Sequence, residues 1–73
     1  NPFDLKEFTK KLTNEFYELR LHHSKINIRI IYAFIEKQII ILLHGFVKKT
    51  QKTPKKEIEI AEQRLKMYKS KKG

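Results

Sequence analysis

Three runs of strand-forming residues follow one another with only short polar turns between them, and no other feature of the sequence constrains the fold as much. The runs are FYELRLH at 16–22, NIRIIYAFI at 27–35 and QIIILLHGFV at 38–47. The first alternates between apolar and polar residues, and the second is rich in β-branched and aromatic residues, which is typical of strands. Because the turns at 23–26 and 36–37 are short, the sequence predicts an antiparallel sheet of about three strands.

The third run is almost continuously apolar. Such a run is typical of a strand that is covered on both faces, so we expect it at the centre of the sheet. Its longest apolar stretch, residues 39–43, is far too short to cross a bilayer, which needs about 20 residues. The sequence therefore predicts no membrane partner.

A helix is expected on each side of these strands. Residues 1–12 begin with Asn and Pro, which suit a helix start, and continue with an apolar stripe of Leu5, Phe8 and Leu12. Thr53 and Pro54 suit the start of a second helix. Its apolar stripe comprises Ile58, Ala61, Leu65 and Tyr68.

Together these elements predict one α+β domain over residues 1–73, in which a small antiparallel sheet is flanked by an N-terminal and a C-terminal helix. A chain of 73 residues permits a single domain. We expect the last four residues, 70–73, to form a frayed tail.

The charge of the chain indicates the class of partner. Lys and Arg number 17 against 8 acidic residues, which gives a formal net charge of +9, and residues 48–73 hold ten basic and three acidic residues. This balance suits a nucleic acid or an acidic protein, although a basic tail that only aids solubility has the same composition. The chain has no cysteine, which excludes disulfides and thiolate metal sites and is consistent with a reducing cytoplasm.

Register places several polar residues on one face of the predicted sheet. If residues 36 and 37 form a two-residue turn, Ile35 pairs with Gln38, and Arg29 lies opposite His44. If residues 23–26 form the first turn, Arg20 lies opposite Arg29. The same face then carries His22, Phe46 and Lys48, with further lysines, including Lys49 and Lys52, along its rim.

Two arginines side by side repel each other, and a sheet with no use for them would rarely place both there. Arginines, a histidine, an aromatic ring and a lysine-rich rim are together the composition of a site that binds a phosphodiester and stacks a base. A structural explanation stays open, because Arg20 could instead form an ion pair with Glu18. A slip of one residue in register would also move Arg29 to the opposite face.

Three blocks resemble the RelE/HigB superfamily of bacterial toxins, and its phage-derived Gp49-like, or HigB-type, branch most closely. The blocks are YELRL at 17–21, IRIIYAF at 28–34 and LLHGFVKKTQKTPKKEIEIAEQR at 42–64. The resemblance covers most of residues 12–68. It implies a RelE-like α+β fold and a toxin of a type II toxin–antitoxin system, which cleaves messenger RNA on the bacterial ribosome and so inhibits translation.

The resemblance also implies roles for single residues. Arg29 matches an arginine that contacts the scissile phosphate in the superfamily, Arg20 matches a basic position on the neighbouring strand, and Lys48 and Lys49 match a basic pair at a strand end. The reaction it implies is attack of an RNA 2′-OH on the adjacent phosphate by a metal-independent endoribonuclease.

Other residues have candidate roles of their own. His44 lies on the same face and is the candidate general base, although it could merely cap backbone groups at a strand end. Tyr68 lies on the apolar stripe, so we expect it in the core rather than in catalysis. His22 and His23 point to opposite faces of a strand, so we expect no metal site and no cofactor.

The resemblance implies as partners mRNA on the ribosome and a cognate antitoxin, expected to carry a helix-turn-helix, in the bacterial cytoplasm. Members of the group normally begin with another strand and helix, for which this chain has no room. We therefore expect an incomplete site, or a sheet edge that a second chain covers. The alternatives are a toxin of the same fold that inhibits DNA gyrase, a non-catalytic module that binds RNA or an acidic antitoxin, and a chain that folds fully only with its partner.

Overall fold

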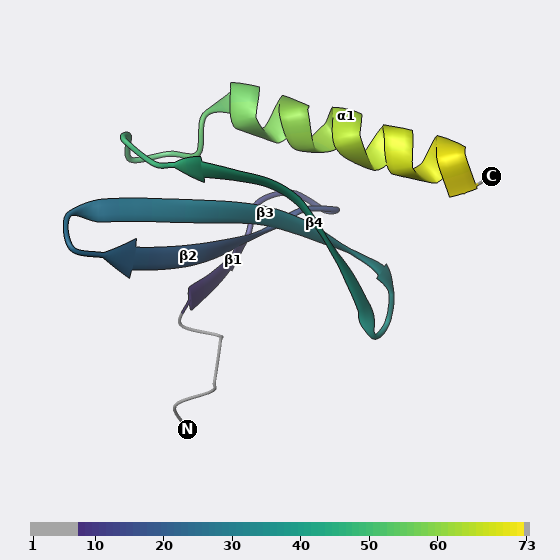
Figure 1. Cartoon of the computed structure of the whole chain (residues 1–73), viewed down its shortest axis with the longest axis horizontal. Coiled ribbons are helices and arrows are strands. Elements are labelled where there is room, and N and C mark those ends of the chain that lie inside the picture. Colours follow the sequence, from purple (N-terminus) through teal and green to yellow (C-terminus); the bar gives the residue numbers. More distant parts are fainter. Residues whose placement is uncertain (1–7, 73) are drawn as a thin grey trace.

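The computed structural model describes residues 8–72, which form an antiparallel sheet and one long helix (Figure 1). The elements are β1 (Thr9–Lys11), β2 (Tyr17–His23), β3 (Ile26–Glu36), β4 (Ile39–Val47) and α1 (Lys55–Lys72). The predicted α+β class is confirmed, with four strands instead of three. No helix in this part of the chain is long and apolar enough to cross a membrane.

The N-terminal helix predicted for residues 1–12 is wrong where the structure can test it. Thr9–Lys11 forms β1, which pairs with β2 and occupies the edge of the sheet beside it. Hydrogen bonding to an existing strand outweighs the local helical pattern, which a few residues specify only weakly. Residues 1–7 of the predicted helix lie outside the described residues.

The strands follow one another in chain order, β1-β2-β3-β4, so β3 and not β4 is the long inner strand. The prediction of β4 as the central strand is wrong, because β4 lies at an edge and its Leu42 is 65% exposed. A continuous apolar run shows that both faces of a strand are apolar, but it does not show that both are covered.

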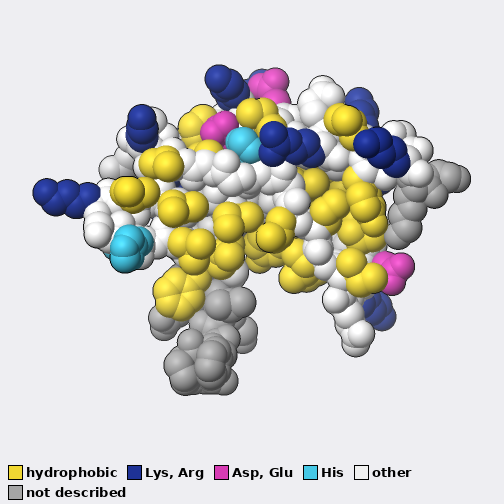
Figure 2. Space-filling view, in the orientation of Figure 1, with side chains coloured by type: hydrophobic (Ala, Val, Ile, Leu, Met, Phe, Trp, Pro, Cys, Tyr) yellow, Lys and Arg dark blue, Asp and Glu magenta, His cyan; other side chains and the backbone are white. Residues whose placement is uncertain are grey.

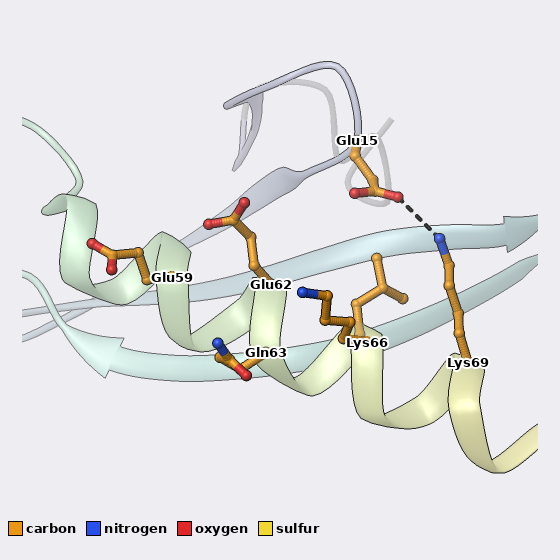
Figure 3. Close-up of a pocket in the computed structure, with 7 residues that line it drawn as sticks. Glu15, Glu59, Glu62, Gln63, Lys66 and Lys69 are labelled. Carbon is orange, nitrogen blue, oxygen red and sulfur yellow. Dashed lines mark hydrogen bonds and ion pairs between the residues drawn. The ribbon is translucent and has the colours of Figure 1, made fainter.

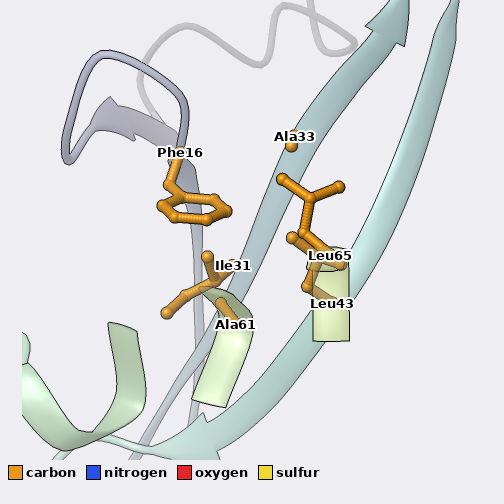
Figure 4. Close-up of a cluster of buried hydrophobic side chains, with 6 residues drawn as sticks. All are labelled: Phe16, Ile31, Ala33, Leu43, Ala61 and Leu65. Atoms are coloured by element: carbon orange, nitrogen blue, oxygen red, sulfur yellow. The ribbon is translucent and has the colours of Figure 1, made fainter. Parts of the chain in front are cut away.

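The helix α1 covers one face of the sheet, and the core lies between the two layers (Figure 4). The buried core residues are Phe16, Ile31, Ala33, Leu43, Ala61 and Leu65. Ala61 and Leu65 come from the stripe predicted for this helix, and Ile58 packs against them, so that prediction is confirmed. Tyr68 is half-buried on α1, and the helix continues to Lys72.

The opposite face of the sheet, here called the open face, carries no helix among residues 8–72. Its exposed apolar side chains include Leu21, Ile26, Phe34, Ile40, Leu42 and Val47. Tyr17 stacks on Tyr32 with ring centroids 5.6 Å apart, and both rings meet Phe34 edge to face. Figure 2 shows hydrophobic side chains spread over the strands, while Lys and Arg lie mainly along the helix side.

The hairpin between β2 and β3 has the predicted register. Ser24 and Lys25 form its turn, with Ser24 at a φ of 55°, and Arg20 pairs directly with Arg29. A positive φ is uncommon for a residue other than glycine but is used in two-residue hairpin turns. The paired arginines therefore lie side by side on the face that α1 partly covers.

The hairpin between β3 and β4 departs from the predicted register. Arg29 pairs with Phe46 instead of His44, and Ile39 pairs with Glu36, so the expected Ile35–Gln38 pair does not form. The turn lies at residues 37–38, and register shifts occur between Ile31 and Tyr32 and between Phe34 and Glu36. The two shifts cancel, because Arg29–Phe46 has the same register as Glu36–Ile39 beside the turn. The turn lies one residue later than predicted, and this displacement changes the partner of Arg29 from His44 to Phe46.

Candidate nucleic-acid interface

Arg29 lies at the centre of the candidate site, between two open pockets on the helix-side face of the sheet. One pocket of about 480 Å³ is lined by Phe8, Arg20, Leu21, His22, Asn27 and Arg29. The other, of about 390 Å³, is lined by Asn27, Arg29, Lys48, Lys49, Thr50 and Gln51. Because both pockets share Asn27 and Arg29, they form two halves of one surface around the arginine.

The first pocket combines charge with apolar surface. Arg20 reaches it from β2 as the cross-strand partner of Arg29. His22 Nδ1 and Asn27 Oδ1 are 2.7 Å apart, so the imidazole is held to the neighbouring strand. An arginine beside a histidine ring and an exposed Phe8 offers both a cation for a phosphate and surfaces on which a base can stack.

The second pocket is polar and lies where β4 ends. The backbone N–H of Lys48 donates to the carbonyl of Asn27 over 2.7 Å, which extends the pairing of β3 with the chain beyond β4. Lys48 and Lys49 therefore leave the sheet beside Arg29, as the sequence predicted for a basic rim. Lys52 lies further along the exposed loop and lines neither pocket.

A buried carboxylate lies behind Arg29. Glu18 is 1% exposed, and its Oε1 is 3.5 Å from Arg29 Nε, whereas the Arg29 side chain is 12% exposed. Arg29 Nη1 donates to the carbonyl of Ile28 over 3.0 Å. The ion pair considered for Arg20 and Glu18 is thus formed by Arg29, and it holds the guanidinium from the side away from solvent.

His44 is on the predicted face but is enclosed by α1. Its Nε2 is 3.1 Å from Glu57 Oε1, and its Nδ1 is 3.1 Å from Arg64 Nη1, which also donates to the carbonyl of Leu43. Since Arg64 can only donate, His44 Nδ1 accepts and Nε2 carries the proton. Both ring nitrogens are therefore occupied, and His44 lines neither pocket around Arg29.

Phe46 is the cross-strand partner of Arg29, and it packs against the core. Its ring stacks on His44 with centroids 5.5 Å apart. The structure therefore brings Arg29, Arg20, His22, Lys48 and Lys49 together around the two pockets. It leaves the predicted residues His44, Phe46 and Lys52 outside them.

A further pocket of about 330 Å³ lies elsewhere, between α1 and the loop before β2 (Figure 3). It is lined by Glu15, Glu59, Glu62, Gln63, Leu65, Lys66 and Lys69. Lys69 Nζ donates to Glu15 Oε2 over 3.2 Å, and both side chains are more than half exposed. Its charges are mixed in sign and well solvated, so it lacks the concentration of cations found around Arg29.

Sequence reasoning missed several contributors to the site, among them Phe8, Asn27 and Thr53. Asn27 binds His22 through its side chain and Lys48 through its carbonyl. The hydroxyl of Thr53 donates to Glu18 Oε2 instead of capping α1. The one available signal was Glu18, an acid at a helix-facing position of a strand, because a buried charge requires a partner.

A comparison with known protein families identifies a match over most of the chain. The family described as phage derived protein Gp49-like (DUF891) matches residues 1–66. This family falls within the toxin-like RelE/HigB-type superfamily and implies partnering with an antitoxin. No curated protein and no solved structure gives a significant match.

Proposed function

The chain belongs to the Gp49-like family of phage-derived proteins, and we propose that it is the toxin of a type II toxin–antitoxin system that cleaves messenger RNA on the ribosome. One observation carries this proposal. Arg29 is held from behind by Glu18 and faces two pockets in which Arg20, Lys48 and Lys49 add three further cations. Fixed cations around an open groove suit a phosphodiester backbone.

The proposed reaction is attack of a ribose 2′-oxygen on the adjacent phosphorus. A P–O2′ bond forms while the P–O5′ bond breaks, which leaves a 2′,3′-cyclic phosphate and a 5′-oxygen that becomes a hydroxyl by taking a proton from a lysine ammonium beside it. Negative charge increases on the phosphoryl oxygens in the transition state. Arg29 and Arg20 stabilise this charge, and Lys48 and Lys49 hold the backbone and the leaving oxygen, because preorganised cations are most effective where charge develops.

The proton of the 2′-OH must pass to a base. His44 Nδ1 is the only ring nitrogen of that residue able to accept a proton, and Arg64 occupies it. His44 can serve as the base only if the Arg64 contact opens. This observation favours a second candidate function, in which the same basic face binds RNA without cleaving it.

A translation-coupled cleavage assay read by primer extension separates the two functions. We expect cuts within the reading frame with the wild-type chain and a loss of at least about a hundredfold in rate with Arg29→Ala. Lys66→Ala removes a solvated cation from α1 and is the matched control, with no expected change. Cleavage by wild type that persists in Arg29→Ala would contradict the site assignment.

Arg29→Ala leaves Glu18 buried without its cation, so the variant could fail by unfolding. The double variant Glu18→Gln with Arg29→Gln removes both charges together, and its circular dichroism establishes whether the fold persists. If wild type binds a single-stranded RNA oligonucleotide but cuts no message, the nuclease proposal is overturned in favour of the binding module. If it neither binds nor cuts, gyrase inhibition is the next activity to assay.

A further inference from the structure

Glu18 is the one almost fully buried charged side chain among the described residues. It projects from β2 beside Phe16 and Ile31, where an apolar side chain would complete the core. Burying a carboxylate costs free energy unless the charge is paired and its oxygens are hydrogen-bonded. Stabilisation of the core therefore does not explain why Glu18 occupies this position, and a role in the site does.

The two oxygens of Glu18 contact two different parts of the site. Oε1 faces Arg29 Nε at 3.5 Å, within ion-pair distance but beyond a normal hydrogen bond. Oε2 accepts a hydrogen bond from the hydroxyl of Thr53, at the end of the lysine-rich loop. One buried carboxylate therefore connects the arginine of β3 with the segment that carries Lys48 and Lys49.

This arrangement limits how the Arg29 side chain can turn. Arg29 Nε is itself buried and makes no hydrogen bond within the described part of the chain. Nη1 is engaged by the carbonyl of Ile28. Arg29 lines both pockets, so the part of its guanidinium that the carboxylate and the carbonyl leave free is the part available to a ligand there.

We propose that Glu18 and Thr53 are positioning residues, which fix the direction of the Arg29 guanidinium and the place of the lysine loop relative to it. Neither residue touches the RNA. The inference deepens the proposed function and rests on it for its kinetic test, but its structural test is independent of cleavage.

Glu18→Gln is the first variant, because glutamine keeps the shape and the acceptor for Thr53 but removes the charge that faces Arg29. We expect kcat to fall about tenfold, as is typical for loss of a supporting residue. We expect KM for the RNA to change by less than about twofold, because the variant keeps every cation that binds the RNA backbone and loses only the orientation of Arg29 toward the charge that develops in the transition state. Glu15→Gln, which removes an exposed acid that pairs with Lys69, is the control and should change neither constant.

Thr53→Val removes the hydroxyl with little change of shape, and Thr53→Ser restores it. We expect the valine variant to lose activity and the serine variant to recover most of it. Recovery by serine supports positioning through the hydroxyl. Equal activity in all three proteins would overturn the role of Thr53.

A double-mutant cycle separates positioning from general destabilisation. If Glu18 acts through Arg29, Glu18→Gln does not lower the rate per folded molecule any further in an Arg29→Gln background, with the folded fraction measured by circular dichroism. A merely structural role would reduce the rate by the same factor in both backgrounds, and that result would overturn the proposal.

The NMR signal of the Arg29 side-chain Nε–H gives a readout that needs no activity. In wild type this proton is buried, so we expect a resolved signal that exchanges slowly with solvent. We expect Glu18→Gln to shift the signal and speed its exchange, while Glu15→Gln leaves both unchanged. If the wild-type chain cleaves nothing, the proposed function fails, but this comparison still decides whether Glu18 orients Arg29. An unchanged signal in Glu18→Gln would overturn the inference.

Discussion

The two faces of the sheet have opposite chemistry and opposite solvent exposure. The helix-side face carries Glu18, Arg20 and Arg29 together with the core, whereas the open face is almost entirely apolar. The more apolar face is therefore the one that α1 leaves uncovered. The difference teaches that hydrophobicity alone does not decide which face a helix covers, because α1 packs where β4 also presents polar groups for its side chains, as the His44–Glu57 pair and the bond from Arg64 to the carbonyl of Leu43 show.

Leu42 and Leu43 provide the sharpest test of this comparison, because they are adjacent leucines with opposite exposure. Leu43 is 5% exposed in the core, and Leu42 is 65% exposed on the open face. We expect Leu43→Ala to lower the free energy of unfolding by about 2–5 kcal/mol. Leu42→Ala should change it by less than about 0.5 kcal/mol. Urea denaturation measures both, and equal losses would show that the open face is covered in solution.

Arg64 tests the polar contacts between α1 and β4. Its Nη1 donates to the carbonyl of Leu43 and to His44 Nδ1, and Arg64→Met removes both hydrogen bonds while keeping the aliphatic stem. We expect a loss of about 1–3 kcal/mol in the free energy of unfolding. Lys66→Met on the same helix is the control. Thermal or urea unfolding with no difference between the two variants would contradict the role given to Arg64.

The basic rim provides a smaller effect, on RNA binding instead of folding. Lys49→Met should lower the slope of log affinity against log salt by about 1, because one phosphate contact is lost. Lys11→Met changes an exposed lysine that pairs with Tyr17 on the side of the open face. Fluorescence titration of a single-stranded RNA oligonucleotide at several salt concentrations should show no change of slope for that control.

The smallest effect is expected at the exposed pair of Glu15 and Lys69, which are 53% and 61% exposed. Solvated ion pairs contribute little, so Glu15→Gln should change the free energy of unfolding by less than about 0.5 kcal/mol. Urea denaturation checks this value. A loss above about 1 kcal/mol would show that the contact between α1 and the loop before β2 is stronger than a surface pair.

The parts of the fold that the sequence predicted are those with local causes. The turn between β2 and β3 has only two residues, Ser24 and Lys25, so it alone fixes the register of this hairpin and the Arg20–Arg29 pair. The stripe of α1 follows from helical periodicity. The register between β3 and β4 depends on whether the turn lies at 36–37 or at 37–38, and the local sequence did not place it at 37–38, which is why Phe46 and not His44 lies opposite Arg29.

The cations of the candidate site could be predicted from the sequence, but the contacts of Glu18 with Arg29 and Thr53 could not. Arg29, Arg20 and the lysines could be placed by register and charge. That Glu18 turns toward Arg29 and Thr53 depends on how α1 and its preceding loop return over the sheet. Likewise, His44 is enclosed by Glu57 and Arg64 from a helix whose packing angle no local pattern specifies.

The direct pairing of Arg20 with Arg29 has a thermodynamic consequence for the folded state. The two cations repel each other while the site is empty, so a bound anion relieves a cost that folding otherwise carries. By linkage, an anion that binds only the folded chain stabilises it by RT ln(1 + [L]/Kd). The rise in melting temperature of the wild-type chain with phosphate, or with short oligonucleotides, therefore measures how strongly each anion binds the folded chain.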